Sequence, residues 1–192
     1  MRCRYLPWLL VLLVGSCQGA PAEPVHSASP VVGSTPPSSV DAAPAGPWIV
    51  FHSDPGGDSR LSLMRPDGSD LTLLTDTVAG YPFGAWSPDG SRVAFLSGSF
   101  GEGALLVINA NGSGESHVTD IEARAPDWSP DGTELVFEAV DGGIYSAEVD
   151  GSALTKISDE GSGPRWAPDG SQIVFFSDTN ANLDIYVMDA DG

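Results

Sequence analysis

Four oxygen-bearing side chains alternate along one short loop, residues 178–184. Asp178, Asn180, Asn182 and Asp184 stand at its first, third, fifth and seventh positions. Oxygen ligands at this spacing can surround Ca²⁺, a hard cation that takes about six to eight of them. The loop lacks the sixth-position glycine and twelfth-position glutamate of an EF-hand loop. The same residue types also suit a plain hairpin turn, so a calcium site and a simple turn are both open interpretations.

Other patterns that carry chemistry are missing from the sequence. No serine lies between two glycines in the spacing of a hydrolase nucleophile elbow. Lys156 is the only lysine, and no glycine-rich phosphate loop precedes it. His52 and His117 are too far apart to show zinc-ligand spacing. We therefore predict no catalytic residues and no cofactor apart from the calcium alternative, and we interpret most carboxylates as turn formers.

The first residues have the features of an exported protein. Arg2 and Arg4 precede an apolar run at 6–14, which is too short to span a bilayer as a helix. The segment Val14-Gly15-Ser16-Cys17 resembles the bacterial lipobox, which implies a signal peptide over 1–16 and lipid attachment to Cys17. Ordinary cleavage near residues 20–22 is the alternative. With the signal removed, no cysteine pair remains, so a hydrophobic core must stabilise the protein without disulfides.

The segment at 17–47 is predicted to be a disordered tether. Residues 18–47 hold seven prolines and no aromatic side chain, so they cannot bury enough apolar surface to offset the entropy of ordering. The whole chain has 26 acidic and eight basic residues, a net charge of −18 and a pI of about 4.1. Such a chain repels phosphate backbones and anionic lipid surfaces, which excludes nucleic-acid binding and a basic membrane-binding patch.

A repeat dominates the chain from Trp48 onward. The motif Trp-Ser-Pro-Asp-Gly begins at Trp86 and Trp128, and Trp-Ala-Pro-Asp-Gly begins at Trp166, at intervals of 42 and 38 residues. A short apolar strand follows each motif, and a second strand then ends in Asn-Gly or Asp-Gly. Strands of this length, separated by such turns every ~40 residues, predict the four-stranded antiparallel blades of an all-β propeller. We interpret the repeated tryptophans as core between blades.

The turn residues support this prediction. In Ser-Pro-Asp-Gly, proline fixes φ near −65° at the second position of a turn, and glycine supplies the left-handed conformation that rejoins the strand. The pattern resembles the TolB-like propeller repeat, and the resemblance covers 48–192. It implies a periplasmic or other extracytoplasmic propeller. A related blade also occurs in prolyl-oligopeptidase-type peptidases, fused to a hydrolase domain that these 192 residues do not contain.

Counting strands gives three, four, four and three in the four repeat units, about 3.5 blades. A propeller usually closes with about four to eight blades. We therefore expect that the sequence is part of a longer protein, or that two chains close one ring as a homodimer.

The function that we expect is a lipid-anchored platform in the cell envelope that binds another envelope protein through its loops. Because those loops are rich in Asp, Ser and Gly, a basic or polar partner is favoured over an anionic one. The alternatives are the propeller part of a larger serine peptidase and, less favoured, a lyase or lactonase with a central metal.

Overall fold

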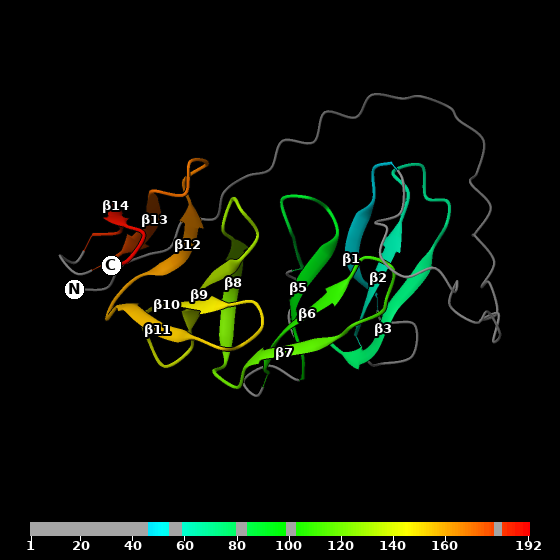
Figure 1. Ribbon diagram of the computed structural model, residues 1–192, viewed down its shortest axis with the longest axis horizontal. Helices are drawn as coiled ribbons and strands as arrows, with labels where there is room; N and C mark the ends of the chain where they lie inside the picture. The colour runs from blue at the N-terminus through cyan, green and yellow to red at the C-terminus, as the bar shows by residue number, and fades with distance from the viewer. Residues whose placement is uncertain (1–45, 54–58, 80–83, 99–102, 179–181) are drawn as a thin grey trace, which may run out of the picture. The chain divides into compact units, whose positions relative to one another are not determined.

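The computed structural model describes residues 46–53, 59–79, 84–98, 103–178 and 182–192, and every regular element in them is a β-strand (Figure 1). The first sheet contains β1 (Ile49–Ser53), β2 (Arg60–Met64) and β3 (Thr72–Val78). The second contains β4 (Ala85–Trp86), β5 (Arg92–Leu96), β6 (Leu105–Asn109) and β7 (Ser116–Thr119). The third contains β8 (Ala123–Trp128), β9 (Glu134–Ala139), β10 (Ile144–Glu148) and β11 (Leu154–Ser158). The fourth contains β12 (Ser162–Trp166), β13 (Gln172–Ser177) and β14 (Asp184–Asp189).

Each sheet is an antiparallel meander whose strands follow chain order. The all-β prediction is confirmed, and so are the predicted strand numbers of three, four, four and three within the described ranges. The four sheets follow one another like the blades of a propeller, in a ring that the described residues do not close (Figure 1).

The predicted turns connect the first two strands of each repeat. Gly90, Gly132 and Gly170 all have φ between 70° and 74°, a left-handed conformation that glycine adopts without strain. In the first of these turns, Gly90 N donates to Ser87 O at 2.9 Å, which closes the four-residue turn. The repeated motif therefore sets the reversal between an inner strand and its neighbour.

Burial on both faces explains why the middle strands are continuous apolar runs. On β5, Val93 and Phe95 pack toward the first sheet, whereas Ala94 and Leu96 pack toward the third. Successive side chains of a strand point to opposite faces, so a sheet between two neighbours must be apolar on both. The same alternation places Phe137 of β9 against the second sheet, where it is fully buried and stacks on Tyr145.

The fourth sheet is buried on one face only. Ile173 and Phe175 of β13 pack against the third sheet, whereas Phe176 is 42% exposed on the opposite face. Ile185 and Val187 of β14 are also exposed. We expect either further repeats of a longer protein or a second copy of the chain to cover this exposed face. Both expectations stay predictions.

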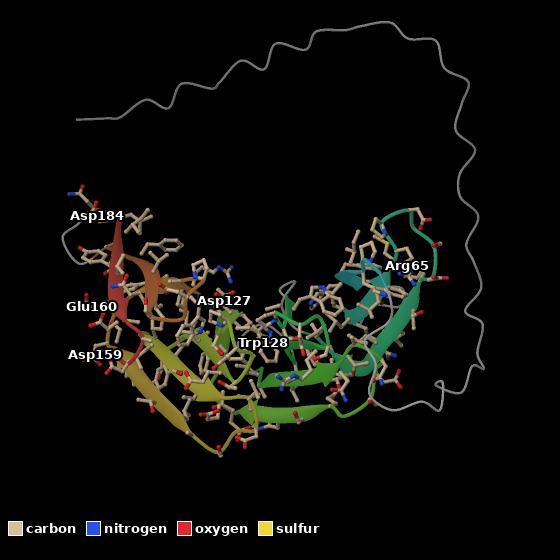
Figure 2. The ribbon with its side chains drawn as sticks, turned by 45° about the horizontal axis from the view of Figure 1, so that its top comes forward. Arg65, Asp127, Trp128, Asp159, Glu160 and Asp184 are labelled. Atoms are coloured by element: carbon tan, nitrogen blue, oxygen red, sulfur yellow. The ribbon has the colours of Figure 1, made fainter. Side chains whose placement is uncertain are left out.

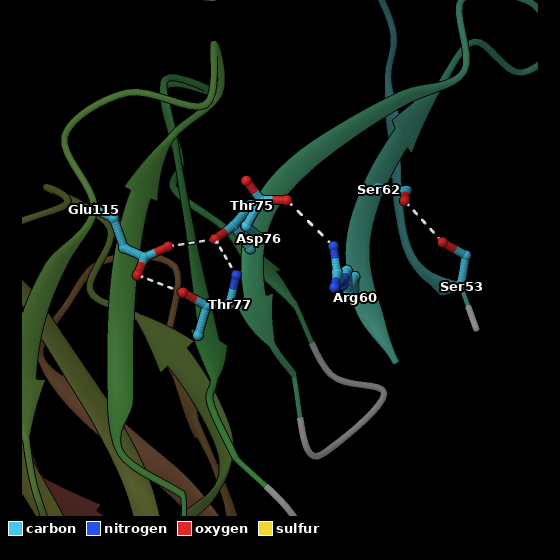
Figure 3. Close-up of polar contacts among 7 residues, drawn as sticks. All are labelled: Ser53, Arg60, Ser62, Thr75, Asp76, Thr77 and Glu115. Atoms are coloured by element: carbon cyan, nitrogen blue, oxygen red, sulfur yellow. Dashed lines mark hydrogen bonds and ion pairs between the residues drawn. The ribbon is translucent and has the colours of Figure 1, made fainter. Parts of the chain in front are cut away.

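Polar contacts join the outer strands of the first and second sheets (Figure 3). The Glu115 carboxylate accepts hydrogen bonds from the Thr75 hydroxyl and, at 2.7 Å, from the Thr77 hydroxyl. Glu115 directly precedes β7, and both threonines lie on β3. This contact tethers neighbouring sheets at their rim, away from the apolar clusters that bury their inner parts.

The predicted signal peptide, the lipid site at Cys17 and nearly all of the tether lie outside the described residues. Among the residues that are described, there is no helix with the length and hydropathy needed to cross a membrane.

Candidate functional site

Two sets of turns gather at the same end of the sheets. In a four-stranded antiparallel meander, the turn between the first two strands and the turn between the last two lie at one end. By position in the repeat, the β2–β3 turn of the first sheet and the β12–β13 turn of the fourth sheet correspond to these turns. Each of these turns carries a side-chain oxygen that accepts a hydrogen bond from the backbone N–H two residues later, at 2.8–3.0 Å. The acceptors are Asp67, Asp89, Asn111, Asp131, Asp150 and Asp169. We call this end of the sheets the carboxylate end.

The aspartates of the carboxylate end are held in their charged form. Hydrogen bonds from the Ser87 hydroxyl, and then from the backbone and hydroxyl of Ser91, lower the pKa of Asp89 to about 2. The pKa of Asp131 is lowered chiefly by the Ser129 hydroxyl, and then by the backbone of Thr133. The pKa values of Asp67, Asp150 and Asp169 are lowered by equivalent bonds from the serine two residues later. At neutral pH this end therefore presents fixed negative charges to solvent.

An arginine closes the junction between the second and third sheets at this end. The Arg92 guanidinium lies over the Trp128 ring, 4.8 Å from its centroid, and donates from Nη2 to Gly132 O at 2.7 Å. Trp128 Nε1 donates to Ala85 O at 2.9 Å. Trp128 is only 5% exposed, and it lies at the end of β8, facing the second sheet (Figure 2). The interpretation of this tryptophan as core between blades is confirmed.

The junction between the third and fourth sheets has no such arginine among the residues that line it at this end. A groove of about 540 Å³ lies there, which we call the Trp166 groove. Four of its lining residues are acidic and none is basic: Asp131, Glu134, Asp169 and Asp191. Its wall also contains Trp166, Gly170 and the β11 residues Thr155 and Ile157. An aromatic ring beside several carboxylates suits a cationic group.

A second groove, of about 660 Å³, lies along the inner strands β4, β8 and β12. Its charges are paired: Arg165 lies 3.3 Å from Asp127, and Arg124 lies 4.0 Å from Glu138. The same carboxylates accept the backbone N–H groups of Trp166 and Gly163, at 2.8 and 3.1 Å. These bonds tie β12 to the third sheet.

The backbone of β8 bulges beside this second groove. Pairing with β9 shifts register between Arg124 and Asp127, and Ala125 has φ of 46°. That left-handed conformation is unfavourable for alanine. The bulge adds irregularity to β8 beside the paired carboxylates.

The predicted calcium loop is only partly described. Asp178 follows β13, Asn182 precedes β14, and Asp184 begins β14 opposite Ser177, at the far end of the fourth sheet (Figure 2). Asn180 lies outside the described residues. Within the described ranges, no group of three or more His, Cys, Asp or Glu side chains could hold a metal ion. The calcium site therefore stays a prediction.

The two histidines weighed as ligands lie on different sheets, His52 on β1 and His117 on β7. Trp166, which the sequence analysis interpreted as core between blades, is partly buried against the apolar cluster of the third and fourth sheets. The sequence analysis assigned no contact to Arg92 or Glu134. The signal was the residue two places after each Asp-Gly turn, which is arginine in one repeat, Glu134 in the next and Gln172 in the last. An alignment of the three motifs shows that this residue differs from repeat to repeat. Only the packing of neighbouring sheets shows what each of these side chains contacts.

Comparisons with known proteins agree with this architecture. Residues 80–192 match the PD40 family model, which describes the TolB beta propeller domain. The uncharacterized protein Atu1656 of Agrobacterium fabrum is 31% identical over 110 residues, which are 50% of this chain and 38% of that protein. Dipeptidyl-peptidase 5 of Porphyromonas endodontalis is 30% identical over 105 residues, which are 50% of this chain and 15% of that protein.

The crystal structure of TolB from Acinetobacter baumannii has the same blade arrangement. It matches with a TM-score of 0.63 and 23% identity, over 74% of this chain and 39% of that one. At this identity the likeness concerns the fold. The chain thus spans less than half the length of each of these three proteins.

Proposed function

Because this chain belongs to the PD40 family of TolB β-propeller domains, we propose that it is a protein-interaction platform of the cell envelope. In this proposal, lipid on Cys17 anchors the protein to a membrane, and residues 18–47 hold the sheets away from it. The sheets serve as a rigid scaffold, and the turns at their ends contact the partner. A partner with a basic or polar surface fits best.

The observation that carries this proposal is the carboxylate end. Its side chains are fixed by hydrogen bonds within each turn, so their charges are already positioned before a partner arrives. Preorganised charge reduces the entropy lost on binding and steers an oppositely charged partner toward the surface. Within the turn that holds Asp67, the Arg65 guanidinium forms an ion pair with Asp70 at 3.2 Å.

Site-specific photo-crosslinking in the native envelope tests the proposal. A photoreactive amino acid replaces Ser152, which is exposed in the β10–β11 turn of the carboxylate end. The matched control replaces Asp141, which is exposed in the β9–β10 turn at the opposite end of the same sheet. We expect a discrete protein adduct from position 152 and none from position 141. Equal adducts from both positions, or none from position 152, would contradict the proposal.

The anchor has its own test. Cells fed radiolabelled palmitate should incorporate label into the wild-type protein, and Cys17→Ser should abolish that label and release the protein from the membrane fraction. Label that persists in the variant would rule out lipid on Cys17. This outcome would leave the proposed interaction function intact, because its contact surface is the carboxylate end and does not include Cys17.

A second function is favoured by one relative. Dipeptidyl-peptidase 5 shares 30% identity over part of this chain, so the sheets could serve as the non-catalytic part of a peptidase. The full natural protein would then release a chromophore from dipeptide p-nitroanilides, and a serine-directed phosphonate would stop the reaction. An interaction platform without a hydrolase would show no such turnover above a buffer blank.

A further inference from the structure

We propose that the Trp166 groove is a binding site for an arginine side chain of a protein partner. The inference rests on the proposed interaction function and deepens it, because it names the group that the carboxylate end receives. The observation that supports it is Arg92, which occupies the equivalent place at the junction between the second and third sheets. We call this the earlier junction, and the junction between the third and fourth sheets the later one.

The two junctions are built alike. Pro88 Cδ lies 3.8 Å from the Cβ position of Gly132, and Pro130 Cδ lies 3.7 Å from that of Gly170. At the rim, a Cβ on Gly151 would meet Val118 O, and one on Gly192 would meet Ile157 O. Neighbouring sheets therefore approach each other in the same way at both junctions.

One side chain differs between the junctions at the position that follows the turn. Arg92 spans the earlier junction, where it covers the Trp128 ring and donates to Gly132 O. Glu134 stands at this position in the third sheet and turns to its own sheet, where Ser146 Oγ donates to its Oε2 at 3.0 Å. The later junction thus has no arginine of its own among its lining residues.

What remains at the later junction is a place suited to a guanidinium. Trp166 is partly exposed, whereas Trp128 is 5% exposed beneath Arg92. The Gly170 carbonyl corresponds to the Gly132 carbonyl that Arg92 bonds. The Trp166 ring and the Gly170 carbonyl therefore lack, among the residues that line the groove, the arginine that covers their counterparts at the earlier junction.

Charge favours the same ligand. Replacing arginine by glutamate makes the groove more negative by two charges, and its lining includes three further aspartates and no lysine or arginine. The volume of about 540 Å³ falls in the range of small-ligand sites, about 300–1,000 Å³. A partner's guanidinium would stack on the Trp166 ring and find carboxylate acceptors beside it.

Arginine is expected to bind in preference to lysine. A guanidinium is planar, stacks on aromatic faces and donates in a fork that matches a carboxylate. An ammonium group is a compact, strongly hydrated charge that forms no such planar stack. The internal example agrees, since the junction residue is Arg92.

Calorimetric titration of the purified chain with the blocked peptide acetyl-Gly-Arg-Gly-amide tests the proposal. Matched peptides carry lysine or the uncharged isostere citrulline in place of arginine. We expect the arginine peptide to bind at least tenfold more tightly than the lysine peptide, and the citrulline peptide to give no signal. Equal affinity for arginine and citrulline would overturn the proposal.

Two variants locate the binding. Glu134→Arg restores the residue of the earlier junction, so it should fill the groove, weaken the arginine peptide at least tenfold and raise Tm by a few degrees. Gln172→Arg adds the same residue at the equivalent, exposed position of the fourth sheet and should bind as the wild type does. Unchanged binding by Glu134→Arg, or equal weakening by both variants, would contradict the site.

A third variant guards against misfolding of Glu134→Arg. Trp166→Phe keeps an apolar ring but offers a weaker cation–π surface, and should weaken the arginine peptide severalfold. Wild-type affinity in Trp166→Phe would also contradict the site. Failure of peptide binding alongside a specific crosslink at position 152 would refute the groove and leave the interaction function standing. Peptide binding without any crosslink would refute the interaction function and leave the groove standing as an arginine site.

Discussion

Replacing Arg92 by alanine should loosen the junction between the second and third sheets. The substitution removes a charge-assisted hydrogen bond to Gly132 O at 2.7 Å, a type of bond that contributes about 1.5–3 kcal/mol when well shielded. It also removes the cation–π contact with Trp128, which contributes about 0.5–1 kcal/mol at an exposed site. Because Arg92 is partly exposed, we take the lower part of each range and expect a loss of about 2 kcal/mol.

Thermal unfolding followed by circular dichroism measures this loss. For a domain of 150–250 residues, about 2 kcal/mol lowers Tm by roughly 4–8 °C. Gln172→Ala is the matched control, because Gln172 follows the same turn in the fourth sheet but is exposed, and it should change Tm little. Arg92→Lys keeps the charge and should recover only part of the loss. If Arg92→Ala unfolds at the temperature of Gln172→Ala, the guanidinium does not hold the junction together.

Three further substitutions test the fold and its charges. Phe137→Ala should lower the free energy of unfolding by about 3–5 kcal/mol in urea titrations, because Phe137 is fully buried and stacked on Tyr145; a loss below 1 kcal/mol would contradict that packing. Trp128→Phe should destabilise the chain more than Trp166→Phe, because the Trp128 indole N–H bonds Ala85 O whereas the Trp166 indole N–H has no acceptor among the described residues, and equal losses would contradict this assignment. Asp89 has a pKa of about 2, below the ordinary 3.8, so its charged form stabilises the fold above pH 4, and this contribution disappears as the pH falls toward 2. Asp89→Asn should therefore lose less stability than the wild type over that interval, measured as urea midpoints, and parallel stability curves for the two proteins would contradict the pKa shift.

Local pattern was enough to predict the strands and turns. The run at 92–96 is apolar at every position after Arg92, and an Asp-Gly turn precedes it, so these residues alone predict the strand that the structure contains. Burial of Phe95 and Leu96 on opposite faces agrees with a sheet that has neighbours on both sides. The turn glycines were predictable for the same reason, because left-handed φ at the end of Ser-Pro-Asp-Gly leaves few alternatives to glycine.

The candidate site could not be predicted in this way. Arg92 bonds a carbonyl 40 residues later, and that contact depends on how one sheet leans on the next. In sequence, Glu134 looks like an ordinary solvent-facing carboxylate of a turn-rich protein. The structure shows that Arg92 occupies the equivalent place in the preceding repeat. The Trp166 groove therefore arises because this residue differs between two repeats, and no sequence motif marks it.

The most direct test of the acidic groove as a receptor for arginine is a ¹⁵N-resolved NMR titration with acetyl-Gly-Arg-Gly-amide. Our account predicts that the Trp166 indole N–H and the backbone amide of Gly170 shift as peptide is added, while the Trp128 indole N–H stays in place beneath Arg92. Shifts centred on Trp128, or small shifts spread evenly over the aspartate turns, would contradict it.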